Sequence, residues 1–262
     1  MLNEYDMIQH RFPGEVNVYP IADVHLGAIE HCEREWTAFL NRVEQENAYL
    51  ILAGDLLNNS TRGTRFANPF EEALRPREAK RKMVEYLEPL KDRILCVVSG
   101  NHEQRTVRES DQDITYDICA RLCLEHLYRE NMAFLTVSVG KRTNEDKYEN
   151  TYNIVVMHGN GGGIYTGAAV NRNERFGNII DGLDCLIAGH VHKGFISKPS
   201  KIVIDSRNAR VTFKSYVVIS CVSWLNYGGY AARAMLLPAK VCDPQRLFFT
   251  ADHHGKRIVT TW

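Results

Sequence analysis

The chain has 262 residues, 44% of them hydrophobic and 24% charged, and its 32 basic residues balance its 32 acidic ones. This composition is typical of a globular protein, and the zero net charge excludes a generally basic protein that coats nucleic acid, although not a local basic groove. No apolar run approaches the ~20 residues of a membrane-spanning helix, and the acidic, polar N-terminus does not resemble a signal peptide.

Seven cysteines are scattered along the chain without a Cys-x-x-Cys pair, and several lie inside apolar runs. An odd number of cysteines in apolar surroundings favours buried free thiols over disulfides or a zinc–thiolate site. Free thiols are typical of a reducing compartment, so we predict a cytoplasmic protein. Repeats, low-complexity tracts and clear linkers are absent, which favours one domain over residues 1–262.

The first metal-capable residues follow a predicted strand. Val16–Tyr19 alternates like a strand, and Asp23 and His25 come just after it. On an extended chain, residues two apart point to the same side. A carboxylate and an imidazole on one side can bind one divalent ion, although a surface Asp and His near a turn is the favoured interpretation of this pair alone.

Two more buried strands end in the same way. Tyr49–Ala53, after an amphipathic helix predicted over residues 33–47, leads to Gly54 and Asp55. The apolar run Ile94–Val98 leads to the tetrapeptide Gly-Asn-His-Glu at residues 100–103. Here Asn101 offers a neutral oxygen to a metal, and His102 can bind a metal or carry a proton at neutral pH.

Basic residues gather around the second of these strands. Arg62 and Arg65 lie in an irregular stretch before it, ahead of a helix that we expect near Ala79–Leu90, and Arg105 and Arg108 follow it. The functional interpretation is a rim that attracts phosphate. A solvated loop and helix face is an interpretation of equal weight.

The second half of the chain repeats the pattern twice. A strand predicted at residues 153–157 ends in His158, and one at residues 183–188 ends in Gly189-His190-Val191-His192, with both imidazoles expected on one side of an extended segment. The other predicted elements are a helix from Ser110 to Leu127 with Ser110 as its cap, a short helix near residues 168–176, a strand at residues 134–139, a hairpin of residues 202–205 and 210–219, and strands at residues 230–237 and 246–251.

The five strand ends together make the case for a metal site. Five times an apolar strand ends, and five times a metal-capable residue follows at once. Sites in layered α/β folds form beyond the carboxyl ends of the strands. Two Asp, one Asn and several His supply enough ligands for two divalent ions, with a carboxylate available to bridge them.

With these motifs in place, the sequence resembles the calcineurin-like metallophosphoesterases over residues 16–192. Their pattern of Asp-x-His, Gly-Asp, Gly-Asn-His-(Glu/Asp), His and Gly-His-x-His is complete here. The resemblance implies an α/β protein built as a four-layered α/β/β/α sandwich of two mixed β-sheets flanked by helices. It also implies two divalent metal ions, with Mn²⁺ favoured, although Fe, Zn, Ni or Mg would suit the same mixed ligands.

The resemblance also assigns roles to single residues. Asp23, His25 and His192 would hold the first metal, Asn101, His158 and His190 the second, and Asp55 would bridge them. His102 would stay off the metals and donate a proton to the leaving oxygen, which makes His102 and Asp55 the expected catalytic residues. The expected substrate contacts are Asn101, Arg62, Arg65, Arg105 and Arg108.

One position departs from the family pattern. Many relatives have Gly-Asp-x-x-Asp, whose second Asp orients the catalytic histidine, but here Asn58 stands at that place. An amide cannot supply that charge, so no Asp–His dyad is expected at this position. What orients His102 is left open by the sequence.

By resemblance, the function is that of a phosphodiesterase acting on nucleic acid or nucleotides through attack by a metal-activated hydroxide. The partner would then be a phosphate ester, DNA or RNA among them. The alternatives are a phosphomonoesterase or small-nucleotide pyrophosphatase and, from another class, a catalytically silent binding scaffold. The complete set of metal ligands together with His102 argues against a catalytically silent scaffold, because a scaffold does not need these residues.

Overall fold

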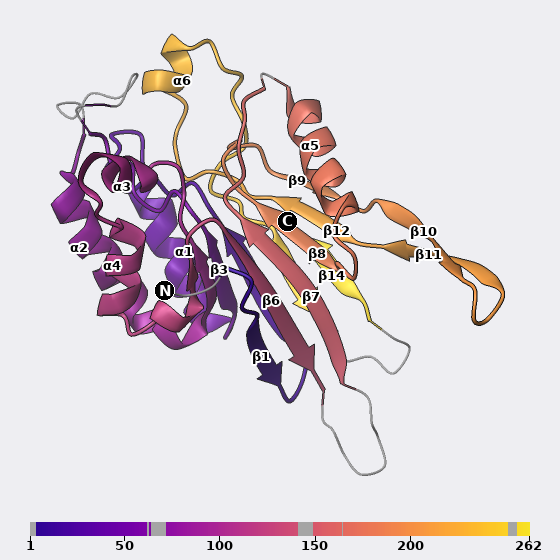
Figure 1. The fold of residues 1–262 in the computed structure, drawn as a ribbon. Helices are drawn as coiled ribbons and strands as arrows, with labels where there is room; N and C mark the ends of the chain where they lie inside the picture. Colours follow the sequence, from indigo (N-terminus) through magenta and orange to yellow (C-terminus); the bar gives the residue numbers. More distant parts are fainter. Residues whose placement is uncertain (1–3, 62, 64–71, 141–148, 164, 251–255) are drawn as a thin grey trace.

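The computed structural model describes residues 4–61, 63, 72–140, 149–163, 165–250 and 256–262. Two six-stranded mixed sheets pack face to face in this part of the chain, and helices cover their outer faces (Figure 1). The predicted four-layered α/β/β/α sandwich is therefore confirmed. No helix among the described residues is long and apolar enough to cross a membrane.

The first sheet has the order β14-β13-β2-β3-β4-β5. Its central strands β2 (Val16–Ile21), β3 (Tyr49–Ala53) and β4 (Ile94–Val98) are parallel to one another and almost completely buried. Strands that are covered on both faces have near-continuous apolar sequences, which is why these were predicted well. The remaining strands are β5 (Tyr128–Arg129), β13 (Arg246–Phe249) and β14 (Ile258–Thr261).

Four helices accompany this sheet on its outer side, seen at the left of Figure 1. They are α1 (Glu33–Gln45), α2 (Pro76–Leu87), α3 (Gln104–Ser110) and α4 (Ile114–Arg121), with short 3-10 turns at Glu88–Arg93 and Glu125–Leu127. Helix α1 buries Trp36, Phe39, Leu40 and Val43, the stripe that its periodicity predicts.

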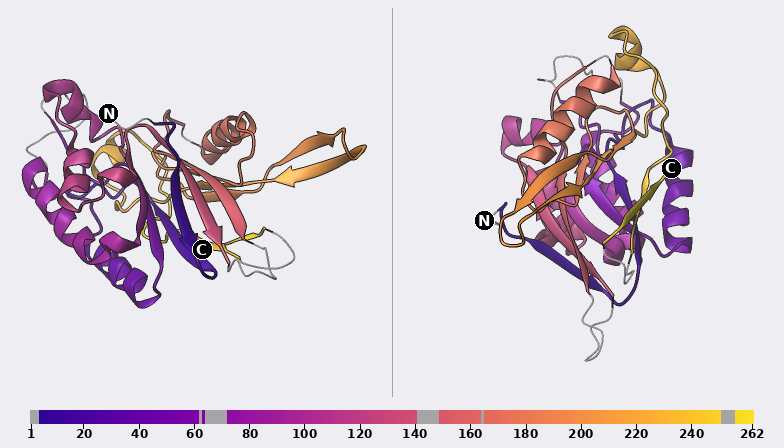
Figure 2. Two further views of the ribbon diagram at one scale, coloured as in Figure 1. Left: turned by 60° about the horizontal axis from the view of Figure 1, so that its bottom comes forward. Right: turned by 90° about the vertical axis from the view of Figure 1, so that its right-hand side faces the viewer.

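The second sheet has the order β1-β6-β7-β8-β12-β9, and α5 (Thr166–Asn178) lies on its outer face (Figure 2). Its strands are β1 (Ile8–Phe12), β6 (Met132–Val139), β7 (Asn150–Met157), β8 (Cys185–Ala188), β12 (Val217–Ser220) and β9 (Phe195–Ser197). Strands β7 and β8 are parallel, so their carboxyl ends reach the same edge.

Hydrogen bonds join the strand ends within each sheet and between the two sheets. The ring of His158, just after β7, contacts the Ala53 carbonyl at the end of β3, with 2.9 Å between Nδ1 and the oxygen. The Gly189 amide after β8 donates to the His158 carbonyl, and the Asp23 amide after β2 donates to the Gly54 carbonyl. The strand ends that carry the metal-capable residues therefore meet at one place.

The helix predicted from Ser110 to Leu127 is wrong in its start and its continuity. Helix α3 ends at Ser110, and Asp111 takes a left-handed φ of 55° that stops it. The next helix is capped by Asp113, whose carboxylate accepts a hydrogen bond from the Tyr116 amide at 2.9 Å. Asp111 and Asp113 can both cap a helix, and it is Asp113, the later of the two, that caps the helix here.

Two predicted strands also need correction. The segment expected as one strand over residues 210–219 is β11 (Arg210–Ser215), which pairs only with β10 (Ser200–Asp205), followed by β12 in the second sheet. Residues 230–237, expected as a strand, begin inside helix α6 (Gly229–Arg233), where two alanines favour a helix.

Two further expectations concern the cysteines and the strand predicted at residues 246–251. All seven cysteines lie in the described part of the chain, and none of them forms a disulfide there. Strand β13 covers most of the strand predicted at residues 246–251, and residue 251 lies outside the described residues.

Candidate metal centre

Residues from five loops converge beyond the carboxyl ends of the strands. Asp23, His25, Asp55 and His158 are at most 4% exposed, although all of them are polar. Asn101, His102, His190 and His192 are half-buried beside them. Buried polar side chains that face one another need a shared ligand or shared hydrogen bonds to offset the loss of water.

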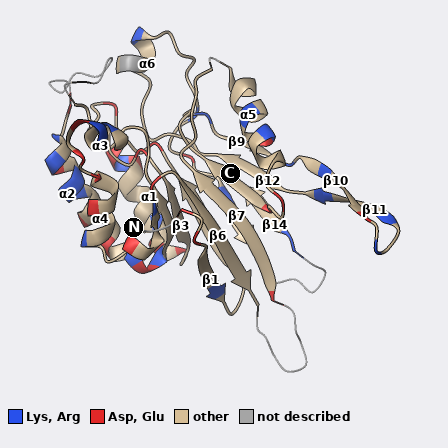
Figure 3. Ribbon diagram, in the orientation of Figure 1, with Lys and Arg blue, Asp and Glu red and all other residues tan. Residues whose placement is uncertain are grey.

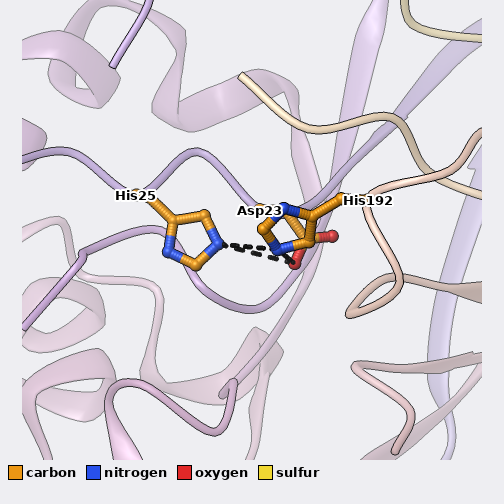
Figure 4. Close-up of side chains that lie close together, drawn as sticks. All are labelled: Asp23, His25 and His192. Carbon is orange, nitrogen blue, oxygen red and sulfur yellow. Dashed lines mark hydrogen bonds and ion pairs between the residues drawn. The ribbon is translucent and has the colours of Figure 1, made fainter. Parts of the chain in front are cut away.

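The first group consists of Asp23, His25 and His192. Asp23 Oδ1 lies 3.3 Å from His192 Nε2 and 3.7 Å from His25 Nε2, and the two imidazole nitrogens are 3.1 Å apart. Figure 4 shows both rings turned toward the carboxylate. These are the three residues predicted for the first metal, and they lie close enough to hold one ion.

The second group consists of Asp55, His158 and His190, joined by Asn101. Asp55 Oδ2 lies 3.1 Å from His158 Nε2. The amide oxygen of Asn101 is 3.0 Å from His158 Nε2 and 2.7 Å from His190 Nδ1. The residues predicted for the second metal therefore also come together around one point.

Asp55 stands between the two groups. Its Oδ2 atom is 3.1 Å from His158 Nε2 of the second group and 3.8 Å from His25 Nε2 of the first. Its other oxygen accepts a hydrogen bond from the His102 amide at 2.8 Å, which fixes the carboxylate in place. This position is the one that a bridging ligand needs.

The backbone of this region is unusual. Asp23, His25, Asp55, His190 and His192 have φ values of 54°, 49°, 51°, 73° and 56°. A left-handed conformation costs a residue other than glycine about 1 kcal/mol or more, and such residues cluster at functional sites. The sequence analysis expected each pair, Asp23/His25 and His190/His192, on an extended segment. That expectation is wrong, because all four residues have left-handed backbone conformations after the strand ends.

Glycines allow the strand ends to approach closely. A Cβ atom on Gly100 would lie 2.1 Å from Asp55 Oδ1 and 2.2 Å from the Asp55 nitrogen, and one on Gly54 would lie 2.8 Å from the Gly100 backbone. Real Cβ atoms do not approach other atoms so closely, so only glycine fits between β3 and β4 here.

Gly100→Ala should therefore displace Asp55 and lower both the metal content and the stability of the protein. Overpacking of this kind costs about 1–3 kcal/mol of unfolding free energy. Urea unfolding and elemental analysis of the purified variant measure both effects. Gly14→Ala is the control, because nothing lies within 4 Å of a Cβ at that position; equal losses in both variants would contradict the close-approach argument.

The charges of the cluster suit cations. Burial by itself would raise the pKa values of Asp23 and Asp55, but the facing imidazoles outweigh it and hold both pKa values below the usual range of a carboxyl group. Burial would lower the pKa of His158, but the Asp55 carboxylate outweighs it and raises that pKa to about 10. Both carboxylates are therefore ionised at neutral pH.

The backbone carbonyl of Asn58 orients His102. The carbonyl oxygen lies 2.7 Å from His102 Nδ1 and also accepts a hydrogen bond from Arg105 Nη1 at 3.0 Å. The side chain of Asn58 points elsewhere, and its amide donates to Glu72 at 2.9 Å. A main-chain carbonyl therefore contacts His102 near the position where the family pattern has an Asp, and a main-chain contact of this kind cannot be predicted from side chains.

His102 faces the cluster with its other nitrogen. Nε2 lies 3.8 Å from Asp55 Oδ2, and His25, Asp55 and His102 are close enough to form a third group of possible ligands. Burial lowers the pKa of His102 well below its usual value, so its ring is neutral at pH 7 in the protein without metal. Geometry alone thus allows two roles, ligand or proton donor.

Glu103 holds the site together from behind, and no role was predicted for it. Its buried carboxylate accepts hydrogen bonds from the backbone amides of Asp55, Leu57 and Gly100 at 2.8–3.1 Å. Burial and the nearby charge of Asp55 raise the pKa of Glu103 to about 7. The sequence signal that could have indicated this role is the position of Glu103 directly after Gly-Asn-His.

The arginines predicted as substrate contacts separate into three cases. Arg62 and Arg65 lie outside the described residues. Arg105 is half-buried beside His102, where it donates to the Asn58 carbonyl. Arg108 is exposed on α3.

The donor set fits divalent metal ions. In each of the first two groups, the carboxylate oxygen and the imidazole nitrogens all lie within 4.8 Å of one another, and the Asn101 oxygen joins the second. Mixed nitrogen and oxygen donors of this kind suit several divalent transition metals, so the ligands do not select one of them.

Comparisons with known proteins give a family and several distant structural likenesses. The profile of the calcineurin-like phosphoesterase family matches residues 17–194. No curated protein matches the chain as a relative. One similar solved structure is the phosphoesterase YfcE from E. coli, with 17% identity and a TM-score of 0.41 over 93% of this chain and 98% of that one. A conserved predicted phosphoesterase from Streptococcus pneumoniae TIGR4 has 11% identity and a TM-score of 0.38 over 94% of this chain and 98% of that one. The calcineurin-like phosphoesterase YfkN from Bacillus subtilis has 10% identity and a TM-score of 0.39 over 95% of this chain and 90% of that one. These likenesses are distant, whereas the family profile spans all five motifs. The chain belongs to the calcineurin-like phosphoesterase family.

Proposed function

We propose that this metal-dependent phosphoesterase is a phosphodiesterase acting on nucleic acid or nucleotides. The observation that carries the proposal is a cavity of about 830 Å³ beside the metal-capable cluster, lined by five cationic side chains and one acid. The cations are Arg75, Arg77, Lys80, Arg81 and Arg121, and the acid is Glu78.

One residue, Asn59, links the cavity to the cluster. Asn59 lines the cavity, and its amide donates to the His102 carbonyl at 2.8 Å and to the Thr106 hydroxyl at 2.7 Å. We infer that a polymer with one phosphate at the cluster places another of its phosphates in the cavity. Figure 3 shows Lys and Arg along α2, the helix that forms much of the cavity lining.

The residues of the cluster have separate tasks in this proposal. Asp23, His25 and His192 would hold one divalent ion, Asn101, His158 and His190 the other, and Asp55 would contact both. Two such ions, when bound, neutralise charge on phosphate oxygens and lower the pKa of water. Their identity is part of the proposal, with Mn²⁺ favoured.

His102 is the proposed proton donor. The Asn58 carbonyl holds Nδ1, so Nε2 is the nitrogen that faces the cluster. The negative charge of a phosphate ester beside the ring favours the protonated form, which then donates from Nε2 to the leaving oxygen. Asn101, Arg105 and Arg108 are the proposed contacts around the phosphate that is cleaved.

The distribution of cations favours diesters over monoesters. A monoester carries close to two negative charges at neutral pH and a diester only one, so a monoesterase usually concentrates cations at the reacting phosphate. Here two arginines, Arg105 and Arg108, are proposed at the cleaved phosphate, whereas five cations line the neighbouring cavity. Two of these five, Lys80 and Arg81, also pair with carboxylates. That arrangement suits the phosphates that flank the cleaved bond, because such contacts position a nucleic acid without reading its sequence.

Hydrolysis of model esters tests this proposal. With Mn²⁺, the purified protein should hydrolyse bis-nitrophenyl phosphate faster than nitrophenyl phosphate and should cleave single-stranded DNA or RNA. A strong preference for the monoester, with oligonucleotides intact across several metals, would favour the phosphomonoesterase alternative. Bound metal without hydrolysis of any ester would favour the silent scaffold.

Removing two cavity charges should weaken binding of the polymer. Arg77→Ala combined with Arg121→Ala should raise KM for an oligonucleotide about tenfold and reduce the slope of its salt dependence by about one per lost phosphate contact. The small diester is too short to reach the cavity, so its KM should change by less than about twofold.

Arg11→Ala is the matched control for this double variant. Met132, at the start of β6, pairs with Met157, the residue before His158, so this end of the sheet is the one near the site. Arg11 pairs with Ser138 near the other end of β6 and therefore lies far from the site. An equal rise in KM for the oligonucleotide in the control would show a general charge effect and contradict a binding role of the cavity.

A further inference from the structure

The hairpin of β10 and β11 stands apart from both sheets. Among the described residues, the two strands pair only with each other, and they project from the body of the molecule (Figures 1 and 2). In their antiparallel register, Ile202 faces Phe213 and Ile204 faces Val211. Because side chains alternate between the faces of a strand, these four apolar residues share one face of the hairpin.

This apolar face is open to solvent. Ile202 is 69% exposed, Ile204 77%, Val211 60% and Phe213 75%. A large apolar side chain carries on the order of 100–200 Å² of accessible surface, so the four together expose roughly 400 Å². A continuous patch of that size marks an interaction surface, and a two-stranded hairpin alone is only marginally stable in water.

The opposite face of the hairpin is polar apart from Val203, and it is attached to the body. Lys201 donates to the carbonyls of Gly177 and Ile180 at the end of α5, at 2.9 and 2.8 Å. Lys214 Nζ lies 3.7 Å from Asp184 Oδ1. The hairpin is therefore held in one orientation, with its apolar face turned away from these contacts.

The charges argue against an anionic partner. Arg210 pairs with Asp205 at 3.4 Å, and this pair, like the two lysines that hold the hairpin to the body, belongs to the opposite face. The apolar face itself carries no charge, whereas surfaces that bind nucleic acid or anionic lipid present Lys and Arg to phosphate. The surface that would complement this face is itself apolar and uncharged. The same face of a second copy of the chain has these properties.

We propose that this face packs against the same face of a second copy of the chain, so that the protein is a dimer. A two-fold axis brings one patch onto itself, and two apolar sheet faces stack about 10 Å apart. The eight side chains would bury roughly 800 Å², about half of a standard interface of ~1,200–2,000 Å². The backbone and rims of the two hairpins supply further area.

Sedimentation velocity over a range of concentrations tests the dimer with the full chain. The wild-type protein should dimerise, and Val211→Lys should raise the dimer dissociation constant at least about tenfold, because the lysine enters a two-fold interface twice. Phe213→Lys is a second variant on the same face and should act in the same direction. Circular dichroism and thermal unfolding should show that the fold outside the hairpin is retained.

Val203→Lys is the matched control, since it makes the same substitution in the same hairpin on the opposite face. It should leave the dissociation constant within about twofold of the wild type. A wild-type protein that stays monomeric, or a dimer that survives both Val211→Lys and Phe213→Lys, would overturn the proposal. Equal dissociation by Val203→Lys would overturn the assignment to this face. Hydrolysis is not measured, so the result is independent of the proposed activity.

Discussion

Replacing Asp55 by asparagine should reduce turnover at least about a thousandfold and lower the occupancy of both metal sites. The Oδ2 atom lies between the two groups of ligands, and a neutral amide there bridges two cations poorly. A thousandfold loss of rate corresponds to several kcal/mol of lost transition-state stabilisation, since each ~1.4 kcal/mol changes the rate tenfold. Elemental analysis and diester hydrolysis of one preparation measure both effects.

The substitution is nearly isosteric, so the fold should survive it. The Oδ1 atom of Asp55 accepts from the His102 amide, and an asparagine oxygen can accept the same hydrogen bond. Asp92→Asn, which changes an exposed carboxylate after α2, is the control and should keep full activity. Two metals at full occupancy with normal turnover in the Asp55 variant would show that Asp55 does not bridge them.

Replacing His102 by alanine should slow hydrolysis of esters with alkoxide leaving groups about 10²–10⁴-fold, the usual contribution of a general acid. Nitrophenolate leaves without a proton, so hydrolysis of nitrophenyl esters should slow far less. Metal content should not change. Rates for both classes of leaving group, measured on protein of known metal content, test each part of this expectation.

This experiment also decides between the two roles that the geometry allows. Because His102 lies near His25 and Asp55, loss of metal in the variant would identify it as a ligand. Equal slowing for both leaving groups would argue against proton donation. His126→Ala, at an exposed histidine in the 3-10 turn after α4, controls for the loss of an imidazole and should have no effect.

The strands that carry the site could be predicted from the sequence, because burial on both faces leaves a continuous apolar run. Strands β3 and β4 begin and end where the apolar runs Tyr49–Ala53 and Ile94–Val98 do. Short edge strands have no such signal, and β1, β9 and β14 were not predicted. The hairpin of β10 and β11 was predicted, but its separation from β12 depends on which strands pair and cannot be seen locally.

The ligand groups were predicted as sets, but the way the chain presents them was not. Asp23 and His25 converge because both take left-handed φ values after β2, not because they alternate on a strand. The support of His102 by the Asn58 carbonyl depends on a main-chain atom, which is the same for every residue type and leaves no trace in the sequence. Glu103 shows its role only when the amides that it accepts from are seen.

The most direct test of a dinuclear phosphodiesterase is a titration of metal-free protein with Mn²⁺ while hydrolysis of bis-nitrophenyl phosphate is followed. The arrangement of Asp55 between two ligand groups predicts that the rate rises until two equivalents are bound and then levels off. A rate that saturates at one equivalent, or hydrolysis that needs no metal, would contradict the account.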